Sequence, residues 1–73
     1  MHVAIDFCPV AGHWERLGTF TVSTDQVRVL RELLEGRDPY EVLDKLPKGQ
    51  IFDSLDMLRS EGHDARVTFY EDT

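Results

Sequence analysis

The sequence predicts a single α+β domain over residues 1–73, in which three helices pack on a small antiparallel sheet in the order β-β-α-α-α-β. Apolar residues alternate with other residues near both ends of the chain, which is typical of half-buried strands. Apolar residues recur at helical spacing in the middle, and Gly and Pro separate the segments. A chain of 73 residues allows one domain with one small hydrophobic core.

Two strands are expected before the first helix. Residues 2–8, HVAIDFC, alternate and place three large apolar side chains on one side: Val3, Ile5 and Phe7. Pro9 is expected to end this strand or to confine it to a sheet edge, because proline has no N–H to donate. After a loose loop a second strand is expected over residues 17–22, with Trp14 at the hairpin tip or on that strand.

The first helix is expected to follow Ser23. A Ser cap followed three residues later by Gln26 is a pattern in which two free backbone N–H groups find partners. Gly36 is expected to end the helix in a left-handed conformation. Its apolar residues are interpreted as one buried arc, made of Val27, Val29, Leu30, Leu33 and Leu34.

Two further helices and a last strand complete the expected fold. Asp38 and Pro39 form a cap and a first turn, and a third helix runs over residues 49–61. Residues 65–70, ARVTFY, alternate as a strand that pairs with one of the first two, and residues 71–73 are expected to be solvent-exposed. The buried residues of the second and third helices are expected to be Val42, Leu43, Leu46, Ile51, Phe52, Leu55 and Leu58.

Composition and charge narrow the class of function. Fourteen acidic residues against eight Lys and Arg give a formal net charge of −6. This charge opposes duplex DNA binding, which depends on basic side chains, and it suits a basic protein surface. One cysteine excludes an internal disulfide. The chain has no signal-peptide pattern and no membrane-length apolar run, so we expect a cytoplasmic protein with no membrane contact.

No pattern for catalysis is found. The sequence has no Gly-rich phosphate-binding loop. Paired carboxylates such as Asp53 and Asp56 fall on helix faces that read as solvated. General acid–base chemistry needs a site that shifts a pKa, and a chain this short has little room for one. We therefore expect no enzyme activity and no cofactor.

One cysteine and three histidines are the candidate ligands for a metal site. These residues offer ligand types that zinc prefers, and a loop could bring Cys8 near His13. The spacing H-x5-C-x4-H from His2 to His13 matches no compact zinc framework, and a second cysteine is missing. With His63 far along the chain, the sequence favours a small packed Cys8 and surface histidines, and no metal is predicted.

The sheet side of the molecule offers anchors for a protein partner. Trp14 precedes two charged residues at a hairpin and is interpreted either as an exposed anchor or as packing over the end of the sheet. Three further side chains are expected on that side: Arg16, Arg66 and Tyr70. An open sheet edge there could also accept a strand from the partner.

An acidic helix surface is the second candidate for partner binding. Asp53 and Asp56 are expected on the outward side of the third helix, with Asp44 on the helix before it. Such charges are either an ordinary wet surface or a complement to a basic partner, which would speed encounter and add specificity.

Residues 24–70 resemble a winged helix-turn-helix. The segment TDQVRVLRELLEG resembles that family's first helix, DPYEVLDKL its second, KGQIFDSLDMLRSEG its recognition helix and ARVTFY a wing strand. The resemblance implies a DNA-binding regulator with the third helix in the major groove, here using Lys48, Gln50 and Arg59. The sequence departs from that role at Asp53 and Asp56, whose carboxylates would repel the phosphates of DNA. The wing also lacks its return strand.

The whole chain also resembles small acidic phage proteins that bind host machinery, such as the RNA polymerase-binding antitermination proteins of Xanthomonas lytic phages. This resemblance implies a phage-encoded regulator, monomeric when free and acting in the host cytoplasm, that binds RNA polymerase or another nucleic-acid-handling complex and alters transcription. An anti-CRISPR protein acting as a nucleic-acid mimic is a further alternative. We expect a protein partner and no direct duplex DNA binding.

Overall fold

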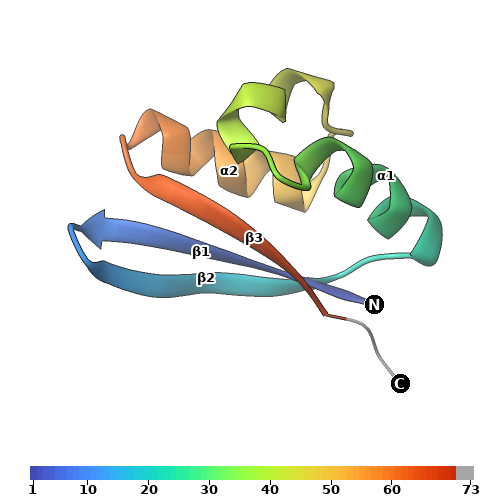
Figure 1. Ribbon diagram of the computed structural model, residues 1–73, viewed down its shortest axis with the longest axis horizontal. Coiled ribbons are helices and arrows are strands. Elements are labelled where there is room, and N and C mark those ends of the chain that lie inside the picture. The colour runs from blue at the N-terminus through green and yellow to red at the C-terminus, as the bar shows by residue number, and fades with distance from the viewer. Residues whose placement is uncertain (71–73) are drawn as a thin grey trace.

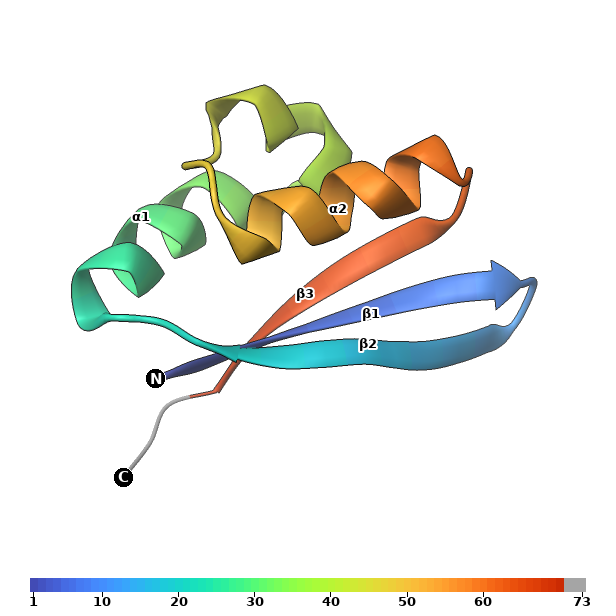
Figure 2. The same cartoon turned by 180° about the vertical axis from the view of Figure 1, so that it is seen from behind.

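The computed structural model describes residues 1–70 and has an α+β fold with one antiparallel sheet. Its elements are β1 (His2–Val10), β2 (His13–Thr21), α1 (Thr24–Leu34), the 3-10 helix η1 (Pro39–Lys45), α2 (Gln50–Ser60) and β3 (Asp64–Tyr70). The strand order is β2-β1-β3, and all three helical segments lie on one face of the sheet (Figures 1 and 2). The predicted α+β class and small antiparallel sheet are confirmed. The expected exposed segment 71–73 lies outside the described residues.

The β1–β2 hairpin is longer and tighter than the sequence suggested. Val10 pairs with His13 across a two-residue turn, and Gly12 takes a φ of 79° there, so the expectation of a loose loop was wrong. Pro9 lies inside β1 instead of ending it. The pairing of β1 with β3 ends at Cys8, so β1 is locally an edge strand at Pro9 and a missing N–H is tolerated.

Helix α1 begins and ends where the sequence predicted. The Ser23 hydroxyl accepts a hydrogen bond from the Gln26 N–H at 3.2 Å, and Gly36 follows the helix with a φ of 70°. Val29, however, is 45% exposed and is not part of the buried arc. At 100° per residue it lies about 130° from the centre of the buried residues, on the solvent side. The buried residues are Val27, Leu30 and Leu34, whereas Leu33 is half-buried and packs against the core.

Segment η1 is a 3-10 helix, where the sequence suggested an α-helix. Asp38 caps it by accepting from the Tyr40 N–H at 3.0 Å, and Pro39 stands at its first position. The Leu46 N–H donates to the Leu43 carbonyl three residues earlier, which is the hydrogen bond of 3-10 geometry. The Tyr40 hydroxyl donates to the backbone carbonyl of His63, which ties η1 to the start of β3. As predicted, Val42, Leu43 and Leu46 are buried.

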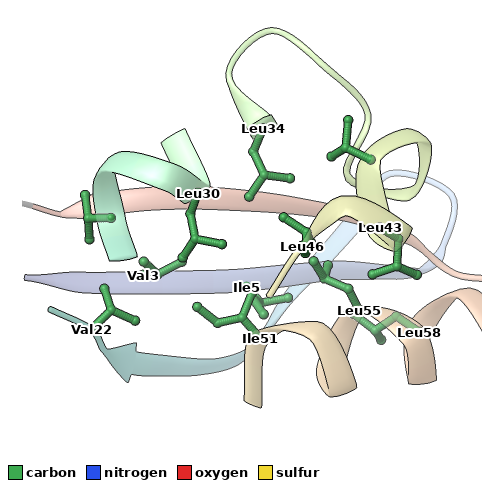
Figure 3. Close-up of a cluster of buried hydrophobic side chains, with 12 residues drawn as sticks. Val3, Ile5, Val22, Leu30, Leu34, Leu43, Leu46, Ile51, Leu55 and Leu58 are labelled. Carbon is green, nitrogen blue, oxygen red and sulfur yellow. The ribbon is translucent and has the colours of Figure 1, made fainter. Parts of the chain in front are cut away.

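The core lies between the sheet and the helical layer. Figure 3 shows aliphatic side chains from β1, α1, η1 and α2 converging on one another. From the sheet, Val3 and Ile5 are fully buried, and from α2, Leu55 is fully buried. Gly62 ends α2 with a φ of 79°, and the His63 N–H then donates to the Leu58 carbonyl. Ile51, Leu55 and Leu58 are buried as predicted, whereas Phe52 is half-buried and packs against the core.

The cap of α1 carries a testable consequence. Replacing Ser23 by alanine is expected to lower the free energy of unfolding by about 1 kcal/mol, because the Gln26 N–H loses its acceptor. The measurement is urea unfolding followed by circular dichroism. Replacing the neighbouring, exposed Thr24 by alanine serves as the control. An equal loss in both variants would show that the Ser23 bond contributes nothing specific.

Candidate interaction surface

The face of the sheet that carries no helix collects side chains from all three strands. Strand alternation places Asp6 of β1 on this face, opposite the core residues Val3 and Ile5. In the registers of the two ladders Asp6 pairs with Arg16 of β2 and with Arg66 of β3. Residues that are ten and sixty positions from Asp6 in the chain therefore meet at one point.

A β-bulge in β2 makes this meeting possible. Ile5 pairs with Gly18, whereas the next residue, Asp6, pairs with Arg16, so Leu17 is an extra residue in β2. With regular pairing Leu17 would stand opposite Asp6. Bulges commonly re-aim a side chain in this way. Here the bulge replaces an apolar neighbour of Asp6 by a guanidinium.

Asp6 is almost completely buried and is held by both arginines. Its exposed fraction is 5%. The Arg16 Nε donates to Oδ1 at 2.9 Å, and the Arg66 Nε donates to Oδ2 at 3.4 Å. The hydrogen bond from Arg16 is the main cause that holds the pKa of Asp6 below its ordinary value of 3.8; burial opposes this shift and Arg66 adds to it. The carboxylate is therefore charged and accepts hydrogen bonds from two guanidiniums.

Two aromatic rings lie against these guanidiniums. The Trp14 ring centre is 4.4 Å from the Arg66 Cζ, and the Tyr70 ring centre is 5.6 Å from the Arg16 Cζ. Arg16 Nη2 also donates to the Tyr70 hydroxyl at 3.1 Å. The two contacts between a ring and a guanidinium are cation–π interactions. We call Trp14, Arg16, Arg66, Tyr70 and Asp6 the sheet-face cluster.

The cluster brings together all four sheet-side residues singled out from the sequence. Trp14 is 39% exposed and Tyr70 43% exposed, so each ring presents surface to solvent although it is stacked on an arginine. Trp14 lies on β2, where one of the two sequence interpretations placed it. Trp, Tyr and Arg are the residue types that carry most binding energy at protein interfaces. Rings already held in place lose little conformational entropy on binding.

The acidic residues lie on the helical side of the molecule. Asp53 is exposed, whereas Asp56 is half-buried and forms an ion pair with Arg59 at 2.9 Å. Asp44 lies on η1, a separate element, and is exposed. Residues 23–61 hold nine acidic and six basic side chains. The helical layer is therefore mixed in charge, and of the three predicted acidic residues Asp44 and Asp53 are more exposed than Asp56.

The residues that the winged-helix resemblance assigns to DNA surround the start and the end of α2. Lys48 Nζ lies 4.0 Å from the centre of the Phe52 ring, and Arg59 is engaged by Asp56. Gln50 is exposed at the first position of α2. Both basic side chains thus have partners within the chain, one aromatic and one acidic.

Cys8, His13 and His63 each contact a different residue. The Cys8 thiol donates to the Val10 carbonyl at 2.9 Å. His13 lies 3.3 Å from a Glu15 carboxylate oxygen, and His63 lies 3.5 Å from Glu61. Within residues 1–70 no three His, Cys, Asp or Glu side chains are grouped so that they could hold a metal ion.

Sequence reasoning missed Asp6, the centre of the cluster. An acidic residue in the middle of an otherwise apolar strand was the available signal, because a buried carboxylate needs cationic partners. Choosing those partners requires the strand register, and the register depends on the bulge at Leu17. Gly18, beside the bulge, is a residue type that often marks such irregularities.

Comparisons with known proteins give no match to this chain. No family model matches the chain, and neither the curated proteins nor the solved structures contain a significant match. Of the helices described in residues 1–70, none has the length and apolar character needed to cross a bilayer.

Proposed function

We propose that this chain is a small non-enzymatic regulator that binds a protein partner through the sheet-face cluster. The partner we propose is a large nucleic-acid-handling complex such as host RNA polymerase, whose transcription would be altered, as in antitermination. The supporting observation is the pair of half-exposed rings, Trp14 and Tyr70, each held on a guanidinium on the open face of the sheet. Aromatic side chains that are exposed and already held in position are typical of binding hot spots.

The charge of the chain favours a protein, and not a nucleic acid, as the partner. The two guanidiniums of the cluster share the Asp6 carboxylate, and the net charge of the chain is −6. Binding to a polyanion draws its affinity from neutralised phosphates and released counterions. Protein surfaces that normally contact nucleic acid are basic, and the exposed carboxylates of Asp44 and Asp53 complement such a surface.

The DNA-binding alternative depends on a winged-helix-like arrangement of the three helices with α2 in the major groove. It would use Lys48, Gln50 and Arg59. It is separated from our proposal by a mobility-shift assay on duplex DNA at several salt concentrations. A DNA-binding regulator predicts tight binding that falls steeply with salt, and we expect none. A nucleic-acid mimic would instead bind an effector nuclease and leave RNA polymerase unbound.

The proposal predicts that truncation of either ring weakens partner binding. Trp14→Ala and Tyr70→Ala are each expected to weaken the affinity for purified bacterial RNA polymerase about tenfold or more. The reason is that each ring offers the partner a large contact area and loses little conformational entropy on binding. The measurement is biolayer interferometry with immobilised protein, accompanied by readthrough of a terminator in vitro.

A matched control uses Val29, an apolar side chain that is 45% exposed on α1, away from the sheet face. Val29→Ala should leave affinity unchanged. Normal circular dichroism of all three variants excludes unfolding as the cause. If both ring variants bind like the wild type, the sheet-face cluster is not the binding surface. If the wild type itself binds no polymerase, the partner named here is wrong.

A further inference from the structure

The open face of the sheet contains a second buried residue besides Asp6. Ala4 lies on that face by strand alternation, opposite Val3 and Ile5, and its exposed fraction is 0%. The three helical segments lie on the other face (Figures 1 and 2), so side chains of the open face itself cover Ala4. The side chains of this face therefore pack on one another over the middle of β1.

One unbroken series of contacts crosses the open face. The Trp14 ring stacks on the Arg66 guanidinium, which donates to Asp6. Asp6 also accepts from Arg16, which donates in turn to the Tyr70 hydroxyl. The series begins on β2, crosses to β3, returns through β1 to β2 and ends on β3. Each ring is thus held by an arginine of the opposite edge strand, and the two halves of the series meet at Asp6.

The hydrogen bonds of this series hold the guanidiniums more firmly than the rings do. Arg16 donates to the two oxygens of Asp6 through Nε at 2.9 Å and through Nη2 at 3.4 Å. Such a bidentate pair fixes the guanidinium plane. Charge-assisted hydrogen bonds to a buried carboxylate are also stronger than cation–π contacts of exposed rings. The rings therefore depend on the arginines, and the arginines depend on Asp6.

We propose that Asp6 is a positioning residue of the partner-binding surface, which fixes the rings of Trp14 and Tyr70 through the two arginines without touching the partner. This inference rests on the proposed function and names the residue on which the affinity of both rings depends. Asp6 is 5% exposed, so a partner reaches the rings and not the carboxylate. A ring that is already fixed loses less conformational entropy on binding. Loss of Asp6 should therefore weaken binding although every contacting side chain is still present.

Two substitutions at Asp6 separate positioning from stability. Asparagine keeps one acceptor and replaces the other oxygen by an NH₂ donor, which faces a guanidinium that is itself a donor. One arginine then loses its partner. Valine removes both acceptors and leaves no unpaired polar atom in the buried position, while the exposed arginine side chains regain water. Asp6→Val is therefore expected to fold and to release both arginines.

The first readout is the motion of the two rings. Trp14 is the only tryptophan of the chain, so the decay of its fluorescence anisotropy reports on one ring directly. In Asp6→Val the fast component of this decay should grow at least about twofold over the wild type, because the released ring moves on its own. The Tyr70 ring, followed by NMR relaxation, should gain the same motion. Ser23→Ala, which loses stability at the α1 cap, is the control and should leave both rings unchanged.

The second readout is affinity for purified bacterial RNA polymerase. Asp6→Val and Asp6→Asn should each weaken binding about tenfold, because the rings must now be ordered on binding. Ser23→Ala should bind like the wild type. In the Asp6→Val background, Trp14→Ala and Tyr70→Ala should each weaken binding only about threefold or less, since residues that act through a shared partner are not additive. A loss of stability alone would not produce this non-additivity.

Two results would overturn the inference: unchanged ring motion in Asp6→Val, or full affinity of Asp6→Val for a polymerase that Trp14→Ala binds weakly. Should Asp6→Val not fold, Asp6→Asn is measured by the same two readouts. Failure of the inference is distinguishable from failure of the proposed function. If the wild type binds no polymerase, the proposed partner is wrong, and the motion of the rings still decides whether Asp6 positions them.

Discussion

Leu55→Ala is expected to lower the free energy of unfolding by about 3–4 kcal/mol. Leu55 is fully buried on the inner face of α2, within the core shared by the sheet and the helical layer. Truncation removes apolar contacts and leaves a cavity that the surrounding side chains fill only in part. Small domains have net stabilities of only about 5–15 kcal/mol, so this one change removes a large share of the total. The measurement is equilibrium urea unfolding followed by circular dichroism.

The control lies two residues further along the same helix. Met57 is 43% exposed, and Met57→Ala removes a side chain of similar volume without opening a cavity. Its expected effect is within about 0.5 kcal/mol, as for most surface substitutions. Similar losses in the two variants would mean that α2 does not pack on the sheet through the face that carries Leu55.

The helical half of the fold was predictable because its signals are local. The cap at Ser23, the cap at Asp38 and the stop at Gly62 are each set by a few neighbouring residues, and all three lie where the sequence placed them. Val29 was assigned to the buried arc because it is apolar, although at 100° per residue its position on the solvent side of the helix could have been predicted. The cap at Asp38 and Pro39 predicted where η1 begins, but it did not tell an α-helix from a 3-10 helix.

The candidate surface was only partly predictable. Trp14, Arg16, Arg66 and Tyr70 were selected for their residue types, but their grouping depends on contacts between strands that are far apart in the chain. A slip of one residue in a strand moves every side chain to the other face. The bulge at Leu17 is such a slip, and no local pattern in β2 fixed its position.

Asp6→Asn is expected to be the most damaging change on the open face of the sheet, lowering the free energy of unfolding by about 1–3 kcal/mol near pH 7. The substitution keeps the shape of the side chain and removes the charge that holds Arg16 and Arg66. The loss stays below that of a fully buried ion pair, because the arginine side chains are 47% and 56% exposed and regain water. Asp44→Asn, at an exposed carboxylate of η1, is the matched control and should be nearly neutral.

The pH dependence gives the same prediction an independent readout. The pKa of Asp6 is lower in the folded protein than its ordinary value of 3.8, chiefly because Arg16 donates a hydrogen bond to it. The folded state therefore binds this proton less readily than the unfolded state, so the charged carboxylate stabilises the fold above that ordinary value. This contribution disappears as the pH falls through the lower, folded-state pKa. The difference in unfolding free energy between wild type and Asp6→Asn should thus be constant from about pH 5 to 8 and should shrink on further acidification. A difference that instead grew toward low pH would mean that Asp6 is not the anionic centre of the cluster, and that the two arginines are held in place by the aromatic rings alone.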